Sequence, residues 1–260
     1  MGVNRRIFLL FFSLWGMSLV AQALTPPESL ALTVYFSERP PFSIVEGQKG
    51  ILVNLTKSIL AEAGIRARFI ELPANRVLEL LRLGQPDALG LGWFRLGDFE
   101  SWAQFSQPLY QDRPLVVLMN TRVSTTVGQP LRLDALLASG LTLGLKTGSS
   151  LGPSLDKKIR ARGLIPLETA LDIPQLLKMV QAGRMDYTLL AEEEAQYLLA
   201  QDPTLVPGLT LLRLADPPPG NQRYFLYSGS FSVAWKSKID EAIDKVRNSP
   251  KYRDLVAVVP

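Results

Sequence analysis

The sequence predicts an α/β protein built from two similar lobes, and two observations support this fold class. Apolar and β-branched runs alternate with amphipathic helical patterns, which is typical of mostly parallel sheets flanked by helices. In addition, residues 76–87 (RVLELLRLGQPD) and 175–186 (QLLKMVQAGRMD) share one pattern at an offset of 99 residues. In both, an apolar helix ends at glycine, and aspartate precedes a buried strand. This repeat predicts one similar unit in each half, although any helix–glycine–strand unit gives similar letters.

The individual elements follow from local signals. Gly64, Gly84 and Gly183 each end an apolar helical pattern. Asp172 is a predicted helix cap with Gln175 three residues further on, as in a capping box. We expect strands over residues 30–36, 66–72, 87–93, 115–119, 141–145, 185–190 and 231–235. We expect helices over residues 51–63, 74–83, 131–138, 150–162, 172–182 and 238–247.

Composition excludes several kinds of chemistry. The 260 residues are 47% hydrophobic and 20% charged, with no cysteine and no histidine. Cysteine nucleophiles, disulfides, thiolate or imidazole zinc sites and a Ser-His-Asp triad are therefore impossible. The net charge of +4 falls to +2 without Arg5 and Arg6, which is too balanced to indicate nucleic acid as a partner. We expect no cofactor and no metal.

The first 23 residues have the features of a secretory signal peptide. Arg5 and Arg6 form a short basic region, residues 7–20 are almost continuously apolar, and Ala21-Gln22-Ala23 is a small-x-small cleavage pattern. The alternative is a permanent membrane anchor, but the apolar run is shorter than the ~20 residues that span a bilayer. We expect cleavage after Ala23, and a product in the periplasm that is not embedded in the membrane.

Six short motifs in order carry a resemblance to a known family. They are Pro40-Pro41-Phe42 after the first strand, Gly50 opening a helix, Leu83-Gly84-Gln85-Pro86-Asp87, Phe105-Ser106-Gln107-Pro108-Leu109-Tyr110, Lys146-Thr147-Gly148-Ser149-Ser150 and Ala182-Gly183-Arg184-Met185-Asp186. With these motifs, residues 30–255 resemble the family 3 extracellular solute-binding proteins, the periplasmic receptors typical of polar amino acid ABC transporters.

The resemblance implies a two-lobed periplasmic binding protein fold of type II, with two crossing strands as a hinge. Lobe one would comprise residues 24–111 and 229–260, and lobe two residues 112–228. The lobes would close over a small solute by hinge motion. The resemblance also implies a monomer that works with an inner-membrane permease or sensor.

Two positions depart from the family pattern. Amino acid receptors of this family carry an arginine for the ligand carboxylate where this chain has Phe99. They carry an aspartate for the ligand ammonium where it has Ala191, with Glu192 beside it. Because a bidentate arginine–carboxylate contact is strong and specific, its loss puts ordinary α-amino acid binding in doubt.

Several residues are candidates to replace that clamp in lobe one. Trp93 and Phe94 follow Gly92 at the end of the third strand and offer aromatic walls for a ligand, or they pack in the core. The further candidates are cations and one aromatic, namely Arg39, Phe42, Arg76 and Arg95. Arg95 is the candidate anion contact. The alternatives are a solvated arginine for Arg95, a surface ion pair for Arg76 and core packing for Phe42.

In lobe two, Ser149 and Ser150 follow Gly148 and are predicted to cap the next helix. The free N–H groups there favour an anion; capping without a ligand is the alternative. Glu192 is a candidate amine contact, although the run Glu192-Glu193-Glu194 more often only occupies a helix N-terminus.

Three functions are compatible with these sequence features. The chain is expected to be a non-catalytic binding protein that delivers a small polar solute, amino acid-like or an organic acid, to a transporter. A receptor that reports to a membrane sensor is the second hypothesis. A dehydratase-like enzyme on the same scaffold is the third, and it lacks a convincing acid or base.

Overall fold

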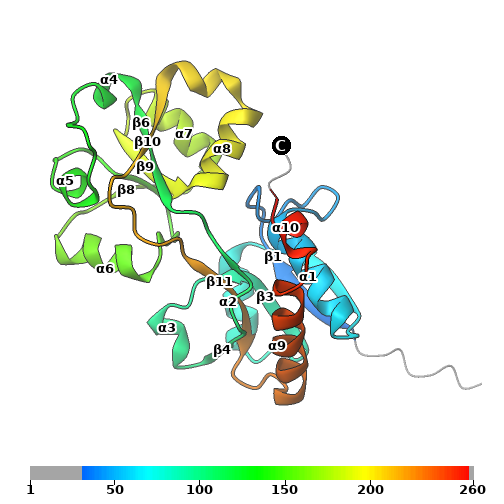
Figure 1. The fold of residues 1–260 in the computed structure, drawn as a ribbon. Helices are drawn as coiled ribbons and strands as arrows, with labels where there is room; N and C mark the ends of the chain where they lie inside the picture. The colour runs from blue at the N-terminus through cyan, green and yellow to red at the C-terminus, as the bar shows by residue number, and fades with distance from the viewer. Residues whose placement is uncertain (1–30, 258–260) are drawn as a thin grey trace, which may run out of the picture.

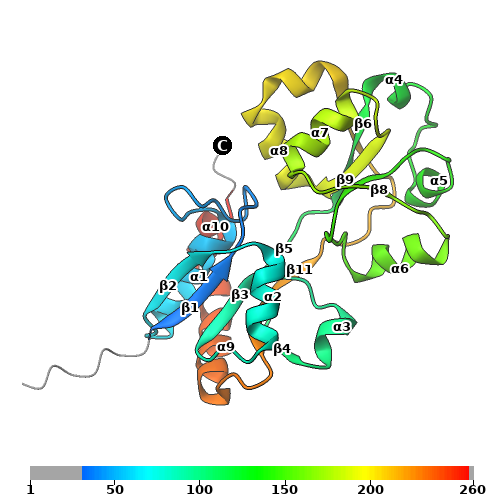
Figure 2. The ribbon, with the colours of Figure 1, turned by 180° about the vertical axis from the view of Figure 1, so that it is seen from behind.

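A computed structural model describes residues 31–257, which form two lobes joined by two crossing segments (Figures 1 and 2). The first lobe contains β1 (Leu32–Phe36), α1 (Ile51–Glu62), β2 (Ala67–Glu71), α2 (Ala74–Arg82), β3 (Ala88–Trp93), α3 (Gly97–Glu100), β4 (Ala103–Phe105) and β5 (Tyr110–Gln111). After the second crossing it gains β11 (Gln222–Ser228), α9 (Val233–Arg247) and α10 (Tyr252–Leu255).

The first sheet has the strand order β2-β1-β3-β11-β4. Pairing is parallel from β2 to β3, whereas β11 is antiparallel to both of its neighbours. Alternation along β1 decides which helix covers each face. Val34 packs in the core with α1 and α9, and Tyr35 packs with α2 on the other face. Both faces of this sheet are therefore covered, as the helix–strand alternation predicts.

The second lobe contains β6 (Leu115–Asn120), α4 (Thr121–Ser124), α5 (Leu133–Leu137), β7 (Gly144–Lys146), α6 (Pro153–Ala161) and β8 (Leu167–Thr169). It continues with α7 (Ile173–Gln181), β9 (Tyr187–Ala191), α8 (Glu192–Gln201), a 3₁₀ helix over Pro203–Gly208 and β10 (Leu209–Arg213). Strand β6 is antiparallel to β10 and β9, β7 is parallel to β8, and a bridge between Leu143 and Tyr187 connects the two groups. Thus β11 and β6, the strands entering from the crossings, run opposite to their neighbours.

The pairing of β11 bears on the expected division into lobes. The sequence assigns residues 222–228 to lobe two, but β11 pairs with β3 and β4 in the first sheet. We therefore propose that lobe two spans residues 112–221 and that lobe one resumes at residue 222.

Most predicted elements form within a few residues of their expected bounds, and three predictions need correction. The helix expected over 238–247 begins five residues earlier, at Val233, as α9. The strand expected over 231–235 does not form, because Ser232 caps α9 by accepting a hydrogen bond from the Trp235 backbone N–H. The strand expected over 141–145 begins three residues later, as β7. The capping role predicted for Asp172 is confirmed, since its side chain accepts from the Gln175 N–H.

The predicted signal peptide, residues 1–23, lies outside the described residues. Among residues 31–257, no helix has both the length and the apolar character needed to cross a membrane.

Candidate functional site

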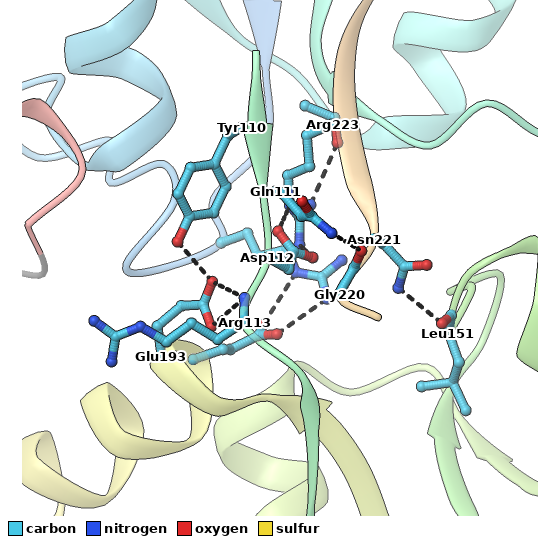
Figure 3. A network of polar contacts seen from close by, with 12 residues as sticks. Tyr110, Gln111, Asp112, Arg113, Leu151, Glu193, Gly220, Asn221 and Arg223 are labelled. Carbon is cyan, nitrogen blue, oxygen red and sulfur yellow. Dashed lines mark hydrogen bonds and ion pairs between the residues drawn. The ribbon is translucent and has the colours of Figure 1, made fainter. Parts of the chain in front are cut away.

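The two crossing segments pair with each other between the lobes (Figure 3). Strand β5 pairs with the start of β11, the Asp112 N–H donates to the Asn221 carbonyl at 2.9 Å, and the Gln111 side chain donates to the Gly220 carbonyl at 3.2 Å. A Cβ on Gly220 would lie 1.6 Å from the Asp112 carbonyl oxygen. This close approach requires glycine, because any side chain would push the segments apart.

A buried ion pair lies across these segments. The Arg223 guanidinium donates to both carboxylate oxygens of Asp112, at 2.6 and 2.8 Å, and the two side chains are only 3% and 2% exposed. The guanidinium also lies 4.0 Å from the Phe42 ring centre and 4.9 Å from that of Phe94. It donates to the Gly92 carbonyl at 3.3 Å. A bidentate charged pair of this kind fixes geometry, so Arg223 holds the hinge to the end of β3.

Helix α8 of the second lobe contacts the first lobe through two glutamates in its first turn. Arg39 forms a bidentate ion pair with Glu194, with N–O distances of 3.0 and 3.1 Å. The Tyr110 hydroxyl donates to Glu193 at 2.8 Å, and the Arg113 N–H donates to the same carboxylate. Burial raises the pKa of the Glu193 carboxyl, which outweighs these hydrogen bonds. A helix N-terminus is a favourable place for both carboxylates.

Three of the charged candidates form ion pairs within their own lobe. Arg76 pairs with Glu79 on the exposed face of α2, and Arg95 pairs with Glu100 at 2.7 Å while lying 5.8 Å from the Phe105 ring centre. Glu192 pairs with Arg213 of β10. The surface ion pair left open for Arg76 is thus what forms, and Arg95 is paired rather than simply solvated.

The aromatic candidates differ in burial. Phe42 is fully buried in the first core, which favours core packing. Trp93 and Phe94 are half-buried at the carboxyl end of β3. Phe99, at one expected clamp position, stacks edge-to-face between Trp93 and Trp102 at 5.8 Å from each. Ala191, at the other, is buried at the end of β9.

The serines of the predicted ligand-binding turn do not cap α6 from the N-cap position. That position is Gly152, and α6 begins at Pro153. The Ser150 hydroxyl donates to Asp156 and accepts from the Gly152 N–H, and the exposed Ser149 hydroxyl donates to the Lys146 carbonyl. The helix expected from residue 150 thus begins three residues later, after Gly152, whose positive φ of 102° suits glycine.

Five residues that form the contacts between the lobes and across the hinge were not predicted as site residues. They are Tyr110, Asp112, Glu193, Glu194 and Arg223. The glutamate run was interpreted as the occupant of a helix N-terminus, which α8 confirms, and two of its three members are also buried. Partners more than 80 positions apart in the chain leave no local pattern, so only the fold brings them together.

A pocket of about 320 Å³ lies beside the second crossing segment. Its lining consists of Leu115, Leu151, Ser154, Leu155, Pro218, Pro219 and Asn221. None of the ten predicted ligand contacts lines it. It is adjacent to Ser150 through Leu151, so it extends the surface of the predicted ligand-binding turn toward the hinge.

No family model matches the chain, and no curated protein matches it. Solved structures do. The GluR0 ligand-binding core from Nostoc punctiforme, in complex with L-glutamate, aligns at a TM-score of 0.67 with 17% identity, over 86% of this chain and 96% of that one. The arginine-, lysine-, histidine-binding protein ArtJ from Geobacillus stearothermophilus aligns at 0.68 with 17% identity, over 87% and 93%.

A histidine kinase sensor domain described as similar to periplasmic binding proteins aligns at a TM-score of 0.68 with 17% identity, over 86% of this chain and 93% of that one. These alignments cover both lobes. The chain therefore has the two-lobed periplasmic binding protein fold of type II, as the sequence predicts.

Proposed function

We propose that the protein is an exported solute-binding protein that captures a small molecule between its lobes and delivers it to an inner-membrane permease. One observation carries the proposal. The lobes are joined by a paired hinge, and α3 of the first lobe lies on the same side of that hinge as α6 of the second (Figures 1 and 2). No hydrogen bond or ion pair within the described residues connects these two helices. A solute can then be enclosed by closing this side.

The residues beside α3 and α6 support a ligand with some apolar bulk and an acidic or polar group. Trp93 and Phe94 lie at the carboxyl end of β3, which is where ligands bind in open α/β sheets. Lys146 lies at the carboxyl end of β7, and its ammonium has no hydrogen bond or ion pair with the described residues. The solved neighbours named for glutamate, arginine, lysine and histidine make an amino acid one candidate. Phe99 and Ala191 argue against the usual amino acid clamp.

Native mass spectrometry of the purified protein, followed by calorimetry, tests this proposal. We expect a co-purified solute that is released on denaturation and rebinds with saturable heat. Its mass should be unchanged after prolonged incubation, because we propose no enzymatic role. Saturable heat with none of a broad solute panel would contradict the binding function, and a changed mass would contradict the absence of catalysis.

The alternative is a sensory role, which the similarity to a histidine kinase sensor domain favours. Cross-linking of this protein to its neighbours in cells separates the two functions. A transport role predicts cross-links to a membrane permease, and a sensory role predicts cross-links to a membrane kinase. Export is tested separately. We propose cleavage after Ala23 and a periplasmic location, so N-terminal sequencing of the exported protein should begin at Leu24.

A further inference from the structure

Two consecutive residues of α8 fasten the second lobe to the first, outside the backbone crossings. The Arg39 side chain lies in the turn after β1 and is 34% exposed, whereas its partner Glu194 is 1% exposed. Both carboxylate oxygens of Glu194 accept from the same guanidinium. Next to it, Glu193 accepts from the Tyr110 hydroxyl. The first turn of α8 is thus held at two points.

The first-lobe end of this attachment is itself fixed. The Arg39 backbone forms a bridge with Ser43, and its carbonyl accepts from the Phe42 N–H at 2.9 Å. The Arg39 guanidinium lies 5.9 Å from the Phe42 ring centre, and that ring packs edge-to-face with Tyr110 at 6.2 Å. Arg39 and Tyr110 therefore both pack against the Phe42 ring. Because this ring already restrains them, forming the two contacts with α8 costs little additional conformational entropy.

Separating these partners is unfavourable. If α8 moved away from the turn after β1, both charge-assisted hydrogen bonds between Arg39 and Glu194 would be lost. The Tyr110 hydroxyl would lose its acceptor as well. Opening on this side of the hinge therefore breaks these interactions, whereas none of the hydrogen bonds and ion pairs of residues 31–257 joins α3 to α6.

The attachments are also placed asymmetrically. Figure 3 shows Tyr110 and Glu193 on one side of the Asp112–Arg223 pair, and Asn221 and Leu151 on the other. The contact on the second side joins the hinge to the start of α6 and does not reach the first lobe's walls. In both ribbon views, α8 lies on the side of the turn after β1 and α6 on the side of α3 (Figures 1 and 2).

We propose that the Arg39–Glu194 pair, with the Tyr110–Glu193 hydrogen bond, is a latch that pins the α8 side of the interlobe region. The lobes then move mainly by rotation about this side, and α6 approaches or leaves α3. The latch uses side chains of the protein alone, so it holds in the absence of solute. It bears on the proposed function only through the direction in which the lobes close.

The chain has no cysteine, so spin labels can be placed on introduced cysteines. The variants Glu46→Cys with Gln196→Cys report the α8 side, and Asp98→Cys with Lys157→Cys report the α3–α6 side. Double electron–electron resonance on the purified protein without added solute should give a narrow distribution of spin–spin distances for the first pair of labels and a broader one for the second. Removing the latch with Arg39→Gln and Glu194→Gln together should broaden and lengthen the α8-side distance.

Arg76→Gln is the matched control, because it breaks an ion pair within α2 and should leave both distributions unchanged. If the double variant does not fold, Tyr110→Phe removes only one hydroxyl and should broaden the α8-side distribution to a smaller extent. An α8-side distribution that is unchanged in folded latch variants would overturn the proposal. The measurement needs no ligand, so failure to find a solute would refute the proposed function and leave this result standing.

Discussion

Replacing Arg223 by methionine is the most direct test of how the hinge is held. The change removes two hydrogen bonds to Asp112, one to the Gly92 carbonyl, and the stacking of the guanidinium on Phe42 and Phe94. Methionine fills a similar elongated space without the charge. It leaves the Asp112 carboxylate 2% exposed and without its cation. Breaking a buried pair in this way costs about 3–5 kcal/mol.

The assay is thermal and urea unfolding followed by circular dichroism. For a chain of this size, 1 kcal/mol corresponds to a shift of about 2–4 °C in Tm, so Arg223→Met should lower Tm by roughly 6–20 °C. The control is Arg76→Met, whose ion pair is 52% and 55% exposed. An exposed pair contributes only about 0–1 kcal/mol, so the control should stay close to the unchanged protein.

A second variant separates the charge from the packing. Adding Asp112→Asn to Arg223→Met removes the stranded carboxylate, and most of the lost stability should return, because the penalty comes mainly from the unpaired charge. An Arg223→Met protein that unfolds within about 1 kcal/mol of the unchanged protein would refute this account of the hinge.

Three further predictions concern single positions. Gly220→Ala should destabilise the protein by about 1–3 kcal/mol, because the new methyl group collides with the Asp112 carbonyl; an unchanged urea midpoint would contradict the close approach. Glu193→Gln should change the pH dependence of stability. Burial raises the pKa of Glu193, so ionising its carboxylate lowers the free energy of unfolding as pH rises from about 4 up to the raised folded-state pKa, and the stability of the variant relative to the unchanged protein should increase over that window. A difference that is constant between pH ~4 and ~7 would contradict this. Asp172→Ala should cost about 1 kcal/mol through loss of the α7 cap, and an equal melting temperature would contradict the cap.

Much of the fold could be predicted because its signals are local. Gly64, Gly84 and Gly183 mark helix ends at positive φ, and each is followed by a strand within a few residues. The error at residues 231–235 has a local cause too. Phe231 and Trp235 are aromatic residues typical of strands, but Ser232 between them is a helix cap, and tertiary packing decides in favour of α9.

The candidate site was predicted less well, because it depends on distance in space. Arg39 is a predicted ligand contact, and the sequence did not reveal that it pairs with Glu194, which lies 155 positions away in the chain. Asp112 and Arg223 are 111 positions apart. Neither residue has a neighbour in the sequence that reveals its partner, and buried charges of this kind are predicted only once the topology of the crossing segments is known.

The proposed function requires the lobes to close over a solute. Small-angle X-ray scattering of the purified protein, with and without the solute identified by native mass spectrometry, tests it most directly. We predict a smaller radius of gyration when the solute is saturating, because α6 approaches α3 by rotation about the hinge. A radius of gyration that is unchanged at full occupancy would contradict it.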